Sequence, residues 1–236
     1  TIRLGGGYRR IAVDTTDNTP DEILDELDEN GDEYDNFPLE LSFSRDSRNR
    51  AIFPTRGAFN RVAAEITVPG STAEYYKLSF RHQSYFPVQD WLTFSVRGDV
   101  GYGDSYSGDG LPFFENFFAG GLTTVRGYKA NTLGPRYESS GDPSGGSFRL
   151  TTGAELVFPF PLLRDAEAFR LAAFVDAGNV FDQASDFDFN DIRVTSGIAA
   201  RWLSPLGPLA ISVAAPLNEQ DGDETEAVQF SFGIPF

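Results

Sequence analysis

The chain has 236 residues, a formal net charge of −16, 22 Phe, 9 Tyr, and neither Cys nor Met. Without cysteine there are no disulfide bridges, zinc–thiolate sites or thiol catalysis, and the acidic balance argues against nucleic acid as a partner. No stretch approaches ~18 uninterrupted apolar residues, so no transmembrane helix is predicted. Strands of a membrane barrel need only ~9–11 residues each and hide half of them in the lumen, so this class stays open.

Apolar and polar residues alternate in segments along the whole chain, and this period of two is typical of strands. The segments fill the chain without a linker, so one all-β domain with about ten strands is expected. The predicted strands are Thr1–Val13, Leu39–Phe43, Phe59–Val68, Tyr76–Phe86, Leu92–Tyr102, Phe148–Phe158, Phe169–Phe181, Ile192–Trp202, Leu209–Ala215 and Val228–Phe236.

One segment has helical rather than strand spacing. In Pro20–Glu29, Ile23, Leu24 and Leu27 fall on one helix face, and acidic residues occupy the first turn. This acidic run and the one at Asp182–Asp191 could suggest calcium sites. Neither has the spacing of a calcium-binding loop, so solvated acidic surfaces are favoured and no metal site is expected.

The connections alternate between two classes, which is typical of outer-membrane barrels. The sequence therefore predicts a transmembrane antiparallel β-barrel with long extracellular loops and short periplasmic turns. The long, acidic class comprises Asp14–Asn36, Pro69–Glu74, Gly103–Ser147, Asp182–Asp191 and Asn218–Glu226. The short class, rich in Pro and Gly, comprises Phe53–Gly57, Phe86–Asp90, Phe158–Ala168 and Ser204–Pro208.

The longest connection, Gly103–Ser147, is expected to be a plug-type loop that packs back on the barrel. It contains the motif VRGY, formed by Val125, Arg126, Gly127 and Tyr128. The guanidinium of Arg126 needs carboxylate partners in the lumen. Glu155 and Asp176 alternate with apolar neighbours and so face inward, which makes them the predicted partners.

The loop segment GGLTTVRGYKANTLGPR, the turns FPTRG and SPLGPL, and a last strand ending in Phe resemble the BamA family of outer-membrane assembly factors. The resemblance covers the whole chain. It makes Val125–Tyr128 the loop motif and implies lumenal contacts to Glu155 and Asp176. VRGY alone is shared with TamA-like and two-partner secretion transporters, whereas the NTLGP continuation and the SPLGPL turn are more specific.

The resemblance also implies a function and a location. Such proteins fold and insert other β-barrel proteins in the bacterial outer membrane, without a cofactor. Expected partners are unfolded outer-membrane proteins, accessory assembly lipoproteins, membrane lipids and lipopolysaccharide.

The chain departs from the family in length. The family's barrels have about sixteen strands, preceded by periplasmic POTRA domains. This chain would supply roughly strands seven to sixteen and no POTRA domain. We expect part of a larger barrel, since unpaired edges do not persist in lipid; a small closed barrel, in which the first strand pairs with the last, is the alternative. The lack of Met fits a removed leader or a longer upstream chain.

The family mechanism centres on a lateral seam at the last strand. Its residues are Val228, Phe230, Ser231, Phe232, Gly233, Ile234, Pro235 and Phe236. Gly233 and Pro235 weaken strand pairing, so an incoming strand could pair at this edge by β-augmentation. Alternatively, Pro235 only ends the strand.

Three other functions compete with assembly. An enzyme is not expected, because the only histidine, His82, shares the parity of Leu78 and Phe80 and has no recognised nucleophile. A passive pore would place charged residues in the lumen, but the long loop favours a plug. A sibling secretion transporter would be distinguished by its upstream domains.

Overall fold

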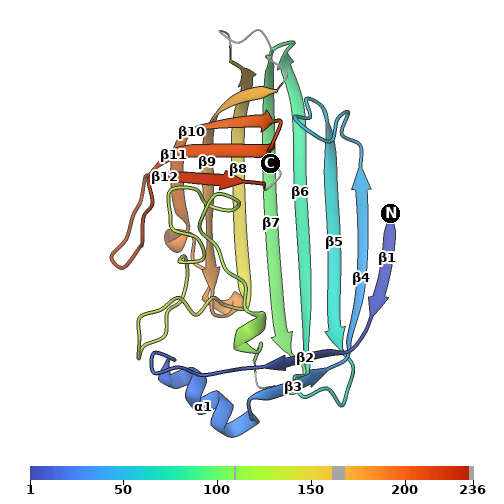
Figure 1. Cartoon of the computed structure of the whole chain (residues 1–236), viewed down its shortest axis with the longest axis vertical. Coiled ribbons are helices and arrows are strands. Elements are labelled where there is room, and N and C mark those ends of the chain that lie inside the picture. Colours follow the sequence, from blue (N-terminus) through green and yellow to red (C-terminus); the bar gives the residue numbers. More distant parts are fainter. Residues whose placement is uncertain (109, 161–167, 234–236) are drawn as a thin grey trace.

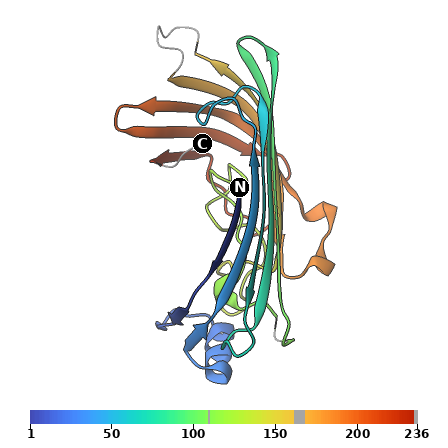
Figure 2. The same ribbon diagram turned by 90° about the vertical axis from the view of Figure 1, so that its right-hand side faces the viewer.

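A computed structural model describes residues 1–108, 110–160 and 168–233. Antiparallel strands form one 10-stranded sheet in the order β1-β4-β5-β6-β7-β8-β9-β10-β11-β12, which confirms the predicted fold class. The sheet curves around the β7–β8 connection, which lies on its concave side (Figures 1 and 2). The strands are β1 (Ile2–Gly6), β4 (Pro38–Asp46), β5 (Gly57–Thr67), β6 (Tyr75–Gln89), β7 (Leu92–Ser105), β8 (Phe148–Pro159), β9 (Phe169–Phe181), β10 (Arg193–Ser204), β11 (Gly207–Pro216) and β12 (Val228–Phe232).

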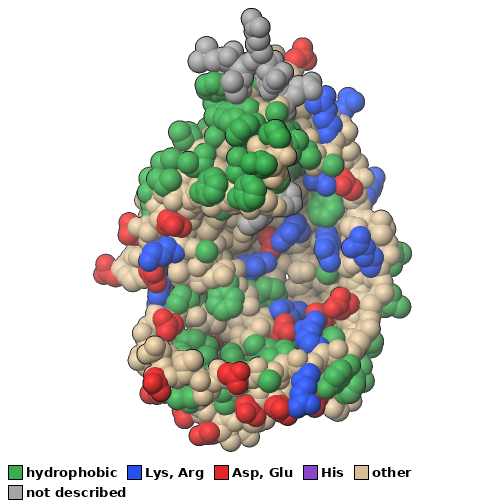
Figure 3. Space-filling model, in the orientation of Figure 1, with side chains coloured by type: hydrophobic (Ala, Val, Ile, Leu, Met, Phe, Trp, Pro, Cys, Tyr) green, Lys and Arg blue, Asp and Glu red, His purple; other side chains and the backbone are tan. Residues whose placement is uncertain are grey.

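The two faces of the sheet differ as the alternation predicts. Val175 is 47% exposed on the convex face, whereas its neighbour Asp176 is 0% exposed on the concave face. Figure 3 shows the concave side, where Lys, Arg, Asp and Glu side chains lie in the hollow, while hydrophobic side chains gather over β10–β12. A barrel wall in lipid has this polarity, because lipid solvates the outer side chains and water solvates the lumen.

The long connections lie at one end of the sheet and the described short turns at the other, as predicted (Figure 1). Residues 161–167 of the predicted turn Phe158–Ala168 lie outside the described residues. Helix α1 (Asp21–Asn30) lies in the β1–β4 connection, within one residue of its predicted bounds at each end. The longer loops also contain the 3₁₀ turns η1 (Phe113–Glu115), η2 (Ala184–Asp186) and η3 (Phe189–Asp191). No helix among the described residues is long and apolar enough to span a bilayer.

The predicted strand Thr1–Val13 is wrong in its second half. After β1 the chain leaves the main sheet, and β2 (Arg9–Ala12) pairs with β3 (Glu33–Asn36) in a separate 2-stranded sheet. The run Gly5–Gly7 weakens the strand at this point. The Tyr8 ring then packs at a tilt against Phe37, and its hydroxyl donates a 2.6 Å hydrogen bond to Asp35, which holds the chain at β3.

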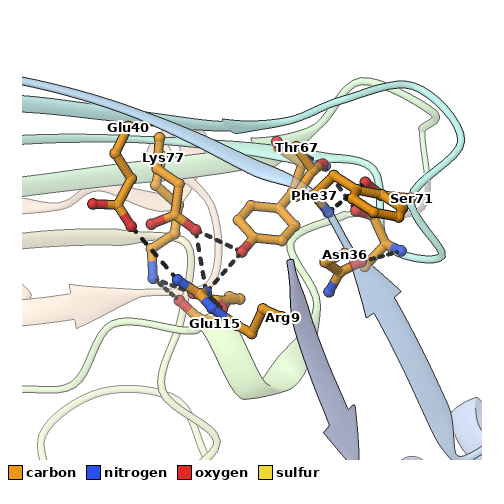
Figure 4. A network of polar contacts seen from close by, with 11 residues as sticks. Arg9, Asn36, Phe37, Glu40, Thr67, Ser71, Lys77 and Glu115 are labelled. Atoms are coloured by element: carbon orange, nitrogen blue, oxygen red, sulfur yellow. Dashed lines mark hydrogen bonds and ion pairs between the residues drawn. The ribbon is translucent and has the colours of Figure 1, made fainter. Parts of the chain in front are cut away.

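The β2–β3 sheet and α1 together form a cap over the long-loop end of the main sheet. Leu27 and Tyr34 of the cap pack with Ala73 and Tyr75, at the start of β6, in a buried core. Figure 4 shows the polar contacts below this core, where Arg9 Nη1 lies 3.1 Å from Glu115 Oε1 and 3.3 Å from Glu65 Oε1. Lys77 Nζ lies 2.9 Å from Glu115 Oε2. These ion pairs connect the cap, the sheet and the β7–β8 connection.

The alternative of a small closed barrel is wrong for this structure. In the described part of the chain, β1 pairs only with β4 and β12 only with β11, so the two strands lie at opposite edges of an open sheet. The last strand is described to Phe232, and Ile234, Pro235 and Phe236 lie outside the described residues.

Candidate functional site

The candidate site is where the β7–β8 connection, which we call the plug loop (residues 106–147), meets the concave wall. Val125 and Tyr128 are each 0% exposed. With Ala119, Leu133 and Val180 they form a buried apolar cluster that anchors the loop on β9. Burial raises the pKa of the Tyr128 hydroxyl to about 12.

Arg126 enters the wall beside this cluster and contacts both predicted carboxylates. Its Nε and Nη2 donate to the two oxygens of Asp176 at 2.6 and 2.9 Å. Its Nη1 lies 2.7 Å from Glu155 Oε1. The guanidinium also lies 3.4 Å from the centroid of the Phe174 ring. A bidentate contact of this kind fixes the orientation of the loop as well as its position.

Two further arginines, which no sequence pattern marks as partners of the loop, complete the cluster. Arg97 Nη2 lies 2.9 Å from Asp176 Oδ1, and its guanidinium also donates to the carbonyls of Thr123 and Thr124 at 2.7 Å. Arg201 donates to both oxygens of Glu155 at 2.6 and 2.8 Å. Arg97 therefore holds the plug loop by its backbone, a contact that strand alternation alone does not reveal.

Gly153 on β8 leaves room for these charges. A Cβ at this position would lie 2.5 Å from Asp176 Oδ1 and 2.7 Å from Arg97 Nε. Gly127 has φ +94°, a backbone conformation that favours glycine, and lets the motif turn tightly against β11.

The loop motif also contacts the last strand. Gln229 of β12 accepts from the Gly127 amide at 3.3 Å and donates to the Tyr128 carbonyl at 2.6 Å. Gln229 is 5% exposed. The side chain therefore binds two backbone groups of the plug loop and couples the VRGY motif to the strand of the predicted seam.

The remaining seam residues follow the predicted alternation as far as the strand is described. Val228, Phe230 and Phe232 are exposed on the convex face, and Ser231 is buried on the concave face. Gly233 has φ +80° and follows the end of β12. The β11–β12 connection, which precedes β12, also contacts the plug loop. The Lys129 amide donates to the Glu224 carbonyl at 2.9 Å, and the Glu226 amide donates to the Gly127 carbonyl at 2.8 Å.

Comparisons with known proteins identify relatives along the whole chain. The Omp85 superfamily domain matches residues 1–236. The outer membrane protein assembly factor BamA of Neisseria meningitidis serogroup B is 36% identical over 224 residues, which cover 83% of this chain and 28% of that protein. BamA of Nitratidesulfovibrio vulgaris is 26% identical over 240 residues, which cover 98% of this chain and 29% of that protein.

A solved structure shows the same fold. The crystal structure of BamA from Haemophilus ducreyi lacking POTRA domains 1–3 superposes with a TM-score of 0.85 at 25% identity, over 97% of this chain and 49% of that chain. The present chain thus spans less than a third of the length of the curated relatives described above. Fold and relatives place it in the bacterial outer membrane. With a family match over its full length, the chain belongs to the Omp85 superfamily.

Proposed function

We propose that this chain provides the wall, plug and seam strand of an outer-membrane protein assembly factor, which folds and inserts β-barrel proteins. The observation that carries the proposal is the contact of Gln229 with the loop motif. It joins a plug held by Arg126 to a short strand whose second edge has no partner among the described residues. An open edge of this kind can template an incoming strand through backbone hydrogen bonds.

The proposed partners are unfolded outer-membrane proteins, accessory assembly lipoproteins, lipids and lipopolysaccharide. Strand templating exchanges hydrogen bonds and breaks no covalent bond, so the assembly step itself requires no catalytic residue or cofactor. A two-partner secretion or TamA-like transporter and a passive pore are the competing functions. A pore is disfavoured by the plug loop packed on the concave wall.

Single cysteines test the seam directly, because these 236 residues contain no native cysteine. In the full-length protein, Ser231→Cys lies on β12 and Ser212→Cys on the neighbouring β11, both on the concave face. We expect disulfide cross-links to a stalled barrel substrate that carries one cysteine to form at Ser231→Cys. They should not form at Ser212→Cys, because β11 is paired on both sides. Equal cross-linking at both positions, or none at Ser231→Cys, would contradict the seam.

Planar-bilayer recording separates assembly factor from pore. A plugged assembly barrel should give small and irregular currents, whereas a porin-like barrel gives large, steady conductance steps. Steady conductance in the wild-type protein would favour the pore.

A further inference from the structure

A serine, a histidine and an asparagine form a hydrogen-bonded chain on the sheet, away from the plug. Ser84 Oγ lies 2.8 Å from His82 Nε2, and His82 Nδ1 lies 2.7 Å from Asn60 Oδ1. His82 and Ser84 are two residues apart on β6, and Asn60 is the register partner of His82 on β5. Strand pairing therefore holds all three side chains in one patch of the same face.

The hydrogen bonds assign the histidine tautomer. An amide oxygen can only accept, so with Oδ1 facing the ring Nδ1 carries the proton. Nε2 then presents its lone pair and accepts the hydroxyl proton of Ser84. A serine hydroxyl on the basic nitrogen of an imidazole, whose other nitrogen is oriented by a third group, is the arrangement of an activated nucleophile.

The patch lies on the convex, lipid-facing side of the wall. His82 and Ser84 alternate with Arg81, which pairs with Asp99, and they share the parity of Leu78 and Phe80, which are 48% and 42% exposed. An ionisable side chain that faces lipid is costly, so its presence indicates a function by default. All three side chains are partly exposed.

The neighbouring positions leave the patch accessible. Gly98 on β7 is the register partner of His82, and a Cβ there would have no atom within 4 Å. Ser84 is flanked by small or medium side chains, Ala58 on β5 and Val96 on β7. A ligand can therefore approach Ser84 Oγ from the membrane.

Aromatic residues indicate the depth of the patch in the bilayer. Phe86 and Phe94, whose ring centroids lie 6.3 Å apart, and the exposed Trp91 lie between Ser84 and the short-turn end of β6 and β7. Aromatic girdles mark the membrane–water interface of barrels. Ser84 thus lies next to this girdle on the hydrocarbon side, near the level of glycerol esters.

A cation is placed beside the same patch. Arg45 on β4 is the register partner of Asn60, and its side chain is exposed on the convex face. An arginine at the interface is suited to bind a lipid phosphate. The patch thus combines a nucleophile, a base and a phosphate-binding group at the surface of a phospholipid leaflet.

We propose that Ser84, His82 and Asn60 form a serine esterase site whose substrate is an acyl ester of a membrane glycerophospholipid. Ser84 Oγ attacks the ester carbonyl while His82 Nε2 takes the hydroxyl proton. The C–O bond to the glycerol breaks, and His82 returns the proton to the leaving alkoxide, so that a lysophospholipid leaves an acyl-serine. Water, with His82 as base, then releases the fatty acid and restores Ser84. Asn60 is a positioning residue, because it acts through His82.

Two measurements on the full-length protein in phosphatidylethanolamine vesicles test the site. The first is labelling of Ser84 by a fluorophosphonate probe, located by mass spectrometry. The second is release of fatty acid from a phosphatidylethanolamine with a labelled acyl chain. Heat-modifiable migration on gels verifies that each variant is folded. Ser79→Ala, on β6 with the opposite parity, is the matched control.

We expect Ser84→Ala to abolish labelling, and both Ser84→Ala and His82→Gln to lower fatty-acid release by about 10²-fold or more. Asn60→Leu should lower release, and Asn60→Asp should restore it, because a carboxylate also accepts from Nδ1; a purely structural asparagine would not show this rescue. Ser79→Ala should leave both measurements unchanged. An unlabelled Ser84 in the folded wild type, or release unaffected by Ser84→Ala, would overturn the proposal and leave the three side chains as a self-satisfied polar cluster in lipid.

Discussion

At the scale of single residues, the charge balance at the plug explains how a guanidinium can be buried in the wall. Arg97, Arg126 and Arg201 surround Glu155 and Asp176, so every buried carboxylate oxygen has a cationic donor. Arg126 is 2% exposed and Asp176 0%. Because both groups are almost completely buried, loss of one partner leaves the others uncompensated.

Arg126→Ala is therefore expected to release the plug loop without unfolding the barrel. Loss of a partner from a buried ion cluster costs ~3–5 kcal/mol, much of it from the stranded carboxylates. We expect loss of growth complementation and faster protease cleavage within residues 106–147, while heat-modifiable migration stays normal.

Two control variants sharpen this prediction. Arg126→Lys keeps the charge but cannot contact both carboxylates in the same way, so it should be intermediate. Arg136→Ala removes a more exposed arginine of the same loop, which pairs with Glu224, and should have a small effect. Normal growth together with unchanged loop cleavage in Arg126→Ala would refute the anchoring role.

Alternation along a strand predicts on which face of the sheet a side chain lies, but not which residues of other segments it contacts. Glu155 and Asp176 lie on the concave face, as their parity indicates. The contacts of Arg97 with the loop backbone and of Gln229 with Gly127 depend on the path of the plug loop, which no local pattern encodes. For Ser84 and His82 a signal was present, since residues two apart on one strand share a face. The third member, Asn60, depends on the register of β5 against β6.

At the scale of elements, the plug loop is bound to a second loop as well as to the wall. Lys129 Nζ and Arg136 Nη1 lie 2.9 and 3.1 Å from the two oxygens of Glu224 in the β11–β12 connection. These hydrogen bonds lower the pKa of Glu224 below its ordinary value. The plug loop and the β11–β12 connection are thus joined by a titratable contact at the long-loop end.

This contact is expected to weaken in acid. Because the pKa of Glu224 is lowered in the folded state, its contribution is complete above the ordinary glutamate pKa and is lost as the pH falls through the lowered value. Hydrogen exchange in residues 217–227, corrected for intrinsic rates, should increase on acidification in the wild type. Glu224→Gln should exchange faster at neutral pH and respond less to acid, and an equal acid response in both proteins would argue against the contact.

Element bounds show where sequence patterns stop being informative. Helix α1 follows its apolar spacing closely, because Ile23 and Leu27 pack in the buried core of the cap, whereas Leu24 is 36% exposed. The alternation in Thr1–Val13 continues across Gly5–Gly7, so the departure of β2 from the sheet could not be located by periodicity. The sequence predicts a turn over Phe86–Asp90, but β6 continues through Pro87 to Gln89, with a register shift between Pro87 and Gln89. Edges and bulges tolerate proline, which local rules treat as an end of a strand.

At the scale of the whole molecule, the convex face of the sheet is a lipid-facing surface. Val175 lies in the middle of β9, between Ala154 on β8 and Ser196 on β10. An arginine at the bilayer midplane of a barrel costs ~2–4 kcal/mol. Val175→Arg should lower the unfolding free energy of the vesicle-inserted protein by about this amount in urea titrations, whereas Val175→Leu should be close to wild type. A wild-type midpoint for Val175→Arg would mean that this face does not contact lipid.

The side chain of Gln229 has a mechanical consequence. It binds one amide and one carbonyl of the plug loop, as a neighbouring strand would. Moving β12 outward must break both bonds, at roughly 1 kcal/mol each, so displacement of the last strand and loosening of the plug are one coupled motion. Under the proposed assembly function, an arriving strand offsets that work only after it has formed backbone bonds of its own. The plug would then set an energetic threshold against brief or poorly paired encounters.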